Sequence, residues 1–472
     1  MKRTLRILLL LLAVACGRKE IIPAPDDSQL PVIPEQGQGN EGETPDNPGQ
    51  GQGSNGAQIP PRVIPVLPTG GGVPEVRISV TEAQWKVLLD AFNKNNNTQQ
   101  YIRCDVSYSD GVISESIKDA GLRLKGNTSR RYPGEAGNLH HVHFGLHFEE
   151  YTENQKLLDA SRLDLKWFKD DAAYCREVYC YDLFHRAGVW TAISSGYTRL
   201  WITIGGKETY MGVYELMEHV RGSYLKHRKD LFGGKDGHLW KARYGASLSD
   251  VNAWMGVDDN EHDYTYELKS KPEEFALAKS QLQYFIRQLN TLKGEAFYTW
   301  AAETMDVELL LKTYAVNVAV GMWDDYWNNT NNFYFYFNPA GKFFFIPYDY
   351  DNTLGTSHDC GSQTDSGRQD PYRWGSDSNP LIVKLLGKAE WKAYYKKCLQ
   401  ELCAGDFAAN ASMDRIKGWH NVIAPYVSND TGEDMEIKDR PASWGNKSQY
   451  RILSPGTNNY FTVKASVVKA MK

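Results

Sequence analysis

The feature that most constrains the fold of this chain is an aromatic stretch with acidic ends at residues 323–355. Its two runs, FYFYF and KFFFIPY, are typical of β-strands, and turn-forming residues at 338–341 lie between them, so the stretch predicts a β-hairpin. Carboxylate and amide side chains gather at both ends of this hairpin: Asp324, Asp325, Asn328, Asn329, Asn331, Asn332, Asp349 and Asp351. Because a hairpin brings its two ends together, we expect these two groups of side chains to lie close to each other.

Such a gathering of carboxylate and amide oxygens suits a hard divalent cation. Mg²⁺ and Mn²⁺ prefer a few oxygens of this kind and keep water molecules that a phosphate can displace. A single Asp-x-Asp in a loop is more often a turn, because aspartate also caps and bends the chain. Two acidic groups joined by one tight hairpin favour the metal site over the turn.

The order of these groups along the chain is acid, asparagine, strand, turn, strand, acid. Protein kinases have the same order, with an aspartate and an asparagine before a hairpin and a second, metal-binding aspartate after it. The sequence contains neither the HRD nor the DFG motif of those enzymes.

Further segments extend this similarity: LRLKGNTSRR, CREVYCYDLFHRAGVW, YMGVYELMEHVRGSYLK and GHLWKA. As a set, together with the hairpin stretch, they resemble the CotH family of atypical, secreted or spore-coat kinases over about residues 75–465. The resemblance implies an α+β, protein-kinase-like fold of two lobes, with a mostly β N-terminal part and a helical C-terminal part. It also implies the transfer of phosphate from ATP to a protein hydroxyl with Mg²⁺ or Mn²⁺.

The resemblance also assigns roles to the acidic groups. Asp325 would orient the acceptor hydroxyl or accept its proton, with Asp324 as the alternate. The metal ligands would be Asn331 or Asn332 together with Asp349 and Asp351. Which of the last two aspartates contacts the metal directly is left open.

The segment KGNTSRR, at residues 125–131, is a candidate phosphate loop. Gly126 permits a tight turn whose backbone NH groups, with Ser129 and the guanidinium group of Arg130 or Arg131, suit an anion. The alternative is a plain hairpin turn. The resemblance favours the first interpretation, because this loop is similar to the family's nucleotide-covering loop.

The strand after this loop departs from the family pattern. Relatives place a lysine before it, whereas this chain reads NLHHVHFGLHF. A zinc site could form from His141 and His143. The alternative is a polar strand face on which histidine stands in place of lysine.

Kinases hold the nucleotide phosphates with a lysine that pairs with a glutamate. The candidates for this pair are Lys241, in HLWKA, and Glu218, at the end of a predicted strand. Both side chains could equally be the solvated ends of strands. A helix predicted at residues 172–187 carries Arg176 and Glu177 in its first turns, which would pair with charges of the site or form a surface ion pair of little weight.

The N-terminus reads MKRTLRILLLLLAVAC, a basic start, a short apolar run and a cysteine. This pattern predicts a lipoprotein signal peptide at residues 1–16 with lipidation at Cys16; the alternative is an ordinary secretory signal. Residues 17–74 read as a disordered Pro-, Gly- and Asn-rich tether, followed by a domain at 75–465 and a tail at 466–472. The protein would lie in the bacterial cell envelope, periplasmic or at the cell surface, held by its lipid alone.

Charge and cysteine content narrow the partners further. The net charge is −5 and no basic block is present, so nucleic acid is not an expected partner. No CxxC pair occurs, and we expect the cysteines after the signal to be buried thiols: Cys104, Cys175, Cys180, Cys360, Cys398 and Cys403.

A second class of function competes with the enzyme. A degenerate kinase fold could serve as a surface lipoprotein in adhesion, or in glycan or protein binding, because the 12% of aromatic residues can line such grooves. The missing lysine near His141 and the scarcity of ATP outside the cell favour this function. The enzyme is favoured by the retained set Asp325, Asn332, Asp349 and Asp351.

Overall fold

The computed structural model describes residues 62–259, 262–356, 365–440 and 450–472. The chain divides into two compact units, residues 1–56 and residues 57–472, and the described residues all belong to the second unit. The predicted signal peptide, Cys16, most of the tether and Cys360 therefore lie outside the described residues. Within the described ranges, the structure contains no helix with the length and apolar character needed to cross a membrane.

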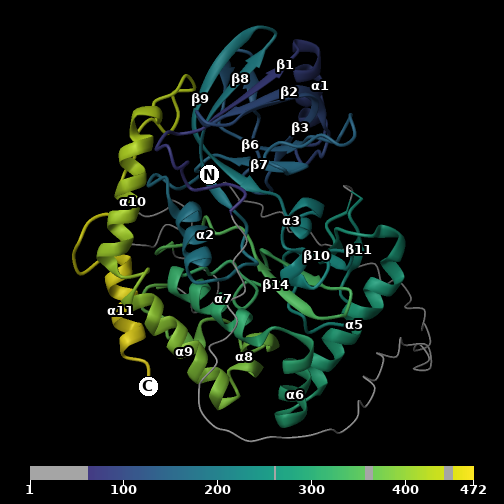
Figure 1. Ribbon diagram of the computed structural model, residues 1–472, viewed down its shortest axis with the longest axis vertical. Coiled ribbons are helices and arrows are strands. Elements are labelled where there is room, and N and C mark those ends of the chain that lie inside the picture. The colour runs from purple at the N-terminus through teal and green to yellow at the C-terminus, as the bar shows by residue number, and fades with distance from the viewer. Residues whose placement is uncertain (1–61, 260–261, 357–364, 441–449) are drawn as a thin grey trace, which may run out of the picture. The chain divides into compact units, whose positions relative to one another are not determined.

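A β-barrel forms the N-terminal part of the second unit (Figure 1). Its strand order is β1-β2-β3-β6-β7-β9-β8, and parallel pairing of β1 with β8 closes it. Along each strand, side chains alternate between the inside and the outside of the barrel. Inward residues such as Ile78, Leu122 and Leu165 are fully buried. The strands are β1 (Glu75–Val80), β2 (Ile102–Ser109), β3 (Ser114–Lys125), β6 (His143–His147), β7 (Arg162–Lys166), β8 (Ser195–Ile204) and β9 (Lys207–Glu218).

Two smaller elements flank the barrel strands. Helix α1 (Glu82–Lys94) follows β1, and its N-cap residue Thr81 accepts a hydrogen bond from the backbone NH of Gln84 at 3.2 Å. The loop between β3 and β6 contains a two-stranded sheet of β4 (Gly134–Glu135) and β5 (Asn138–Leu139).

The predicted aromatic hairpin is confirmed. Its strands are antiparallel, and the backbone NH of Asn338 donates to the carbonyl of Lys342 at 3.0 Å across the turn. Gly341 has a φ of 80° there, a conformation that glycine adopts without steric cost. The hairpin belongs to a sheet with the order β11-β12-β10-β13-β14, made of β10 (His238–Ala242), β11 (Met255–Val257), β12 (Tyr266–Leu268), β13 (Phe333–Phe337) and β14 (Phe343–Pro347).

Helices form most of the C-terminal part, which gives the α+β fold that the sequence predicts (Figure 1). The central one, α7, is buried on nearly every side, in agreement with its apolar sequence. The helices are α2 (Arg176–Arg186), α3 (Gly222–His227), α4 (Lys229–Phe232), α5 (Phe275–Thr291), α6 (Gly294–Thr304), α7 (Val307–Val320), α8 (Pro380–Leu385), α9 (Ala389–Ala404), α10 (Ala409–Ile423) and α11 (Tyr460–Lys469).

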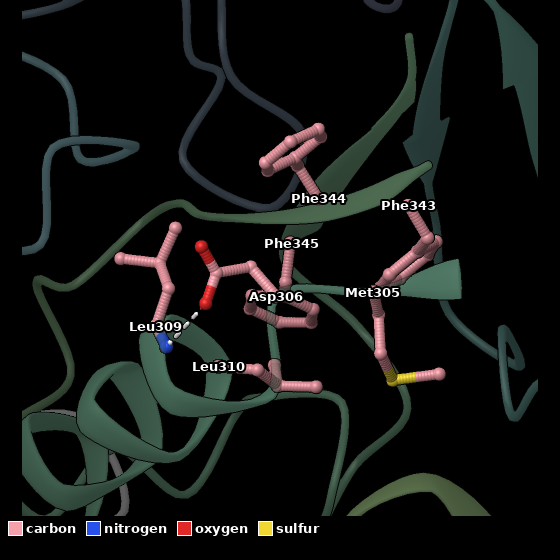
Figure 2. Close-up of a pocket in the computed structure, with 7 residues that line it drawn as sticks. All are labelled: Met305, Asp306, Leu309, Leu310, Phe343, Phe344 and Phe345. Atoms are coloured by element: carbon pink, nitrogen blue, oxygen red, sulfur yellow. Dashed lines mark hydrogen bonds between the residues drawn. The ribbon is translucent and has the colours of Figure 1, made fainter. Parts of the chain in front are cut away.

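The first turn of α7 packs against β14 (Figure 2). Asp306 caps the helix, because its carboxylate accepts a hydrogen bond from the backbone NH of Leu309 at 3.0 Å. The backbone of Met305 forms an isolated parallel β-bridge with Phe343 at the start of β14. The crevice between these elements is too narrow for a water molecule, so it is part of the core and not a ligand site.

Two predicted boundaries differ from the structure. Residues 62–74, expected to be the end of the tether, pack on the barrel: Ile64 is 3% exposed, and the backbone NH of Val63 donates to Ser194 Oγ at 3.1 Å. Helix α11 continues to Lys469, through the first residues of the expected tail, because Val468 is buried in the core. Of the described cysteines, Cys403 is partly exposed, and the others are buried free thiols, as expected: Cys104, Cys175, Cys180 and Cys398.

Candidate active site

Lys166, the last residue of β7, is the centre of a buried group of charges. Its Nζ donates hydrogen bonds to Asp349 Oδ1 at 2.7 Å, to Asp351 Oδ2 at 3.4 Å, and to Glu177. The lysine side chain is 7% exposed, so these ion pairs are poorly screened by solvent. A barrel strand, helix α2 and the segment after the hairpin thus meet at one ammonium group.

The three carboxylates around Lys166 can hold a metal ion. Glu177, Asp349 and Asp351 each offer one oxygen, and these oxygens lie within 4.8 Å of one another. They form the single such group of three or more His, Cys, Asp or Glu ligands in the described ranges. Hard oxygen ligands of this kind fit Mg²⁺ or Mn²⁺. The structure brings the two predicted aspartates together and adds Glu177 to them.

Negative charge exceeds positive charge in this group. Glu215, which lies opposite Lys166 on β9, adds a fourth carboxyl group and accepts a hydrogen bond from the Ser195 hydroxyl. Burial raises the pKa of Glu215 well above its ordinary value. Burial also raises the pKa of Asp351, to about 8, and the nearby Asp349 carboxylate acts in the same direction. A divalent cation would relieve this repulsion, which is a physical reason to expect one at this position.

Helix α2 fixes the backbone of the segment after β14. Glu177 Oε1 accepts a hydrogen bond from the backbone NH of Tyr350 at 3.1 Å, and Tyr181 Oη accepts one from the backbone NH of Asp349 at 3.0 Å. The two helical residues are four apart and therefore share one face of α2. Asp349 has a φ of 64°, a left-handed conformation that few residues other than glycine, asparagine and aspartate adopt. These contacts hold the unusual conformation in place.

The helix begins four residues later than the sequence predicts. Asp171 accepts a hydrogen bond from the backbone NH of Arg176 at 2.8 Å and also pairs with its guanidinium group, so the residues before Arg176 form a turn. Arg176 and Glu177 are both buried, which rules out the surface ion pair that the sequence left open.

Asp324 lies in a ring of amide groups at the other end of the hairpin. Its carboxylate accepts hydrogen bonds from the side-chain amides of Asn329, Asn331 and Asn332 at 2.6, 3.3 and 2.8 Å. Burial nevertheless raises the pKa of Asp324 to about 6, and the Asp349 carboxylate contributes to this shift. The two acidic ends of the hairpin therefore interact, as the sequence predicts.

Asp325 is more deeply enclosed than Asp324. It is 3% exposed, and it accepts hydrogen bonds from Asn317 Nδ2 at 2.7 Å and from the backbone NH of Asn328 at 2.8 Å. Burial raises its pKa to about 7. Asn317 also accepts a hydrogen bond from the Tyr350 hydroxyl at 2.8 Å, so it joins the two ends of the hairpin. Asn317 is not among the residues predicted from the sequence, although a polar residue in an otherwise apolar helix is a signal of such a role.

The candidate phosphate loop has a constrained shape. Gly126 has a φ of 101°, and a Cβ atom there would lie 2.2 Å from Ser129 Oγ, so only glycine fits. Arg130 donates to the backbone carbonyls of Gly126, at 2.7 Å, and Thr98, and it forms no ion pair with the residues that the structure describes. Arg131 differs, because it pairs with Glu433.

Glu218 and Lys241 do not form the predicted pair. Glu218 is buried and makes two hydrogen bonds of 2.8 Å with Arg228, whose planar guanidinium group matches a carboxylate better than an ammonium group does. Lys241 instead lies over the rings of Tyr334 and Tyr348, 5.7 and 5.8 Å from their centroids. Lys166 does pair with a glutamate, Glu177, beside the acidic hairpin. The sequence does not predict this pair, because Lys166 has the pattern of an ordinary strand end.

The histidines of the strand β6 region make structural contacts. His141 Nε2 donates to the carbonyl of Met211 at 2.8 Å, and His143 Nδ1 accepts a hydrogen bond from the backbone NH of Trp167 at 3.1 Å. Neither histidine belongs to a group of three or more metal-ligating residues within the described part of the chain. The structure thus gives no support to the zinc interpretation.

The part of the chain that contains this site matches a known protein family. Residues 122–454 match the family described as CotH kinase protein. The matched segment includes Lys166, Glu177 and both acidic ends of the hairpin. A search of curated proteins finds no significant match. Because the matched segment covers well over half of the sequence, the chain belongs to the CotH kinase family.

Proposed function

We propose that this protein transfers the terminal phosphate of ATP to a hydroxyl group of a protein acceptor, with Mg²⁺ or Mn²⁺ as the metal. The observation that carries the proposal is the contact of Lys166 with both Glu177 and Asp349. Protein kinases need a strand lysine paired with a helix glutamate, and a metal-binding aspartate after a hairpin. Here the three groups are Lys166 of strand β7, Glu177 of helix α2 and Asp349 after the hairpin. A two-lobed, kinase-like arrangement is part of this proposal.

Each part of the site has a role in this proposal. Asp349 and Asp351, with Glu177 beside them, would hold the metal, which neutralises the phosphate charge when it is bound. Glu177 orients the ammonium group of Lys166 toward the phosphate oxygens. The remaining contacts with the nucleotide and the metal would come from Gly126, Ser129, Arg130, Asn331 and Asn332.

Asp324 is better placed than Asp325 to accept the proton of the acceptor hydroxyl. Its carboxylate is partly exposed, and a pKa near 6 leaves it ionised and still basic at neutral pH. We expect Asp324→Asn to lower kcat by roughly 10²-fold or more without a change in Tm. Asp325→Asn should instead lower Tm, because it changes a buried hydrogen-bonded group. If kcat falls with an unchanged Tm only in Asp325→Asn, the base is Asp325.

Phosphate incorporation tests the proposed function. The purified protein, incubated with γ-labelled ATP and Mg²⁺ or Mn²⁺, should label itself or an added mixture of protein acceptors, and EDTA should abolish the labelling. The absence of both labelling and metal-dependent ATP binding would contradict the proposal.

The binding module remains the second candidate, because of one observation. Tyr244 and Trp254 are 72% and 54% exposed, and the Trp254 ring packs edge-on against Tyr264 with centroids 4.8 Å apart. Exposed rings of this kind contact glycans and peptides. In that case Lys166 would serve as the permanent counter-ion of the acidic group, and the fold would bind a partner without catalysis.

We also propose that the protein is held in the bacterial cell envelope through a lipid on Cys16. The short basic and apolar N-terminus supports this proposal. Cys16→Ser should move the protein from the membrane fraction to the soluble fraction when cells are fractionated, since the lipid is the expected anchor. A protein that stays with the membrane after this change would contradict lipid anchoring.

A further inference from the structure

A cavity of about 360 Å³ lies beside helix α1, which packs on the core of the barrel. Its lining comes from one face of α1, from the segment 132–136 and from Ile204 at the end of β8. The volume falls within the range of sites that bind small ligands. None of the lining residues belongs to the candidate active site, so the proposed reaction leaves this cavity without a role.

The buried residues of the lining are apolar. Trp85, Leu89 and Ile204 are 2%, 6% and 2% exposed, and they belong to the core of the barrel. The indole NH of Trp85 donates to the carbonyl of Gly134 at 3.0 Å, which ties α1 to the segment 132–136. The two walls of the cavity are thus joined by the core itself, and the cavity is pre-formed.

The exposed residues of the lining carry more negative than positive charge. Glu82, Asp90 and Glu135 contribute three carboxylates, and Lys86 contributes one ammonium group. Lys86 Nζ is paired with Asp90 at 2.6 Å. Glu135 accepts a hydrogen bond of 2.5 Å from the Tyr132 hydroxyl, and neither Glu82 nor Glu135 pairs with a cation of the described residues.

One further cation lies at the edge of the cavity. Lys207 of β9 donates to the carbonyl of Ala136 at 3.4 Å. With Lys207 counted, three carboxylates still face two ammonium groups, one of which is paired with Asp90. Water solvates exposed carboxylates, so their charge alone would not indicate a ligand. Here the carboxylates surround a cavity with an apolar interior, and that combination does indicate one.

The cavity matches a side chain with an apolar stem and a cationic end. Lysine and arginine both bury their aliphatic stems against apolar surface while the charged group stays at a polar rim. Arginine fits better, because its planar guanidinium group is more weakly hydrated and pairs with a carboxylate through two hydrogen bonds. Tyr132 adds an aromatic ring to the lining, of the kind on which guanidinium groups stack. We propose that the cavity binds an arginine side chain of a partner protein, with Glu82 and Glu135 as its counter-ions.

A partner bound there would contact the segment that follows the candidate phosphate loop. Residues 132–136 come directly after that loop, and Arg130 of the loop donates to the carbonyl of Thr98, just beyond the end of α1. Both walls of the cavity therefore continue into residues that hold the loop. The binding itself does not rest on the proposed function and can be measured without ATP or metal.

Binding of a blocked tripeptide, the amide of N-acetyl-Gly-Arg-Gly, tests the proposal. NMR titration that observes the peptide should detect binding to the unchanged protein. Binding should be roughly tenfold or more weaker in the double variant Glu82→Gln/Glu135→Gln, because charge-assisted contacts are lost. The same peptide with citrulline, a neutral isostere of arginine, should bind the unchanged protein as weakly. Glu401→Gln, at a 66% exposed glutamate of α9, is the matched control and should bind normally. Equal affinities of the unchanged protein and the double variant would overturn the proposal.

Two further variants separate the cavity from a general attraction by surface charge. Asn93→Trp, at an exposed position of the lining, fills the cavity and keeps every charge, so it should weaken binding by a similar factor. Lys86→Met removes the competing ammonium group and frees Asp90, so it should strengthen binding, an effect that misfolding cannot produce. All the substituted side chains are exposed, so each variant should keep the Tm of the unchanged protein. Unchanged binding in Asn93→Trp, or weaker binding in Lys86→Met, would also overturn the proposal.

Discussion

Asp349→Asn should abolish phosphate transfer from ATP while the protein stays folded. The substitution removes a negative charge from the group formed by Glu177, Asp349 and Asp351, and an amide binds a divalent cation more weakly than a carboxylate does. It also removes one of the three anionic partners of Lys166, beside Glu177 and Asp351. We expect the transfer rate to fall by roughly 10²-fold or more, together with weaker binding of Mg²⁺.

Asparagine is the appropriate replacement because of the backbone. Asp349 has a φ of 64°, and asparagine adopts this left-handed conformation more readily than alanine does. A loss of activity in Asp349→Asn would therefore reflect the lost charge and not a change in the course of the chain. Alanine at this position would combine the two effects.

The matched control is Asp119→Asn on β3. Asp119 also has a left-handed backbone, with a φ of 59°, and its carboxylate pairs with Arg103 on the surface of the barrel. This variant should keep full activity and full Mg²⁺ binding. Activity that survives in Asp349→Asn, or that is lost equally in both variants, would contradict a metal site at Asp349.

The hairpin and its acidic ends could be predicted because the signals are local. Two aromatic runs and a turn specify the pairing of β13 with β14, and the pairing then brings Asp324 within electrostatic range of Asp349. The α+β character follows for the same reason, because strand and helix periodicities are read over short windows. None of these features depends on which distant segment packs against the hairpin.

The ion pairs could not be predicted, because their partners are set by tertiary packing. Lys166 and Glu177 meet Asp349 only because the end of β7 and the start of α2 face the segment after β14. In the sequence, Lys166 is one of several lysines at the ends of strands. Lys241 has the same pattern, and nothing in the sequence indicates that its ammonium group lies over two tyrosine rings.

The second large effect is expected on stability, at Glu218. This residue is 1% exposed, makes two hydrogen bonds of 2.8 Å with Arg228 and accepts one of 3.1 Å from the backbone NH of Ser194. Glu218→Ala leaves the buried guanidinium group of Arg228 without its partner. We expect the free energy of unfolding to fall by about 3–5 kcal/mol, measured by chemical denaturation at pH 7.

The pH dependence of unfolding gives an independent check, with a sign fixed by the pKa of Glu218. Burial alone would raise this pKa, but Arg228 and His227 outweigh it and lower the value from 4.5 to about 2. The contribution of Glu218 to the free energy of unfolding is thus fully present above about pH 4.5 and is lost as the pH falls toward 2. This acid-dependent loss of stability should be smaller in Glu218→Ala.

Glu208→Ala is the control on the same strand. Glu208 is half exposed and pairs with Arg77 on the surface, so its removal should lower the free energy of unfolding by less than about 1 kcal/mol. Equal losses of stability in the two variants would contradict a buried ion pair at Glu218 and reopen its assignment to the nucleotide site.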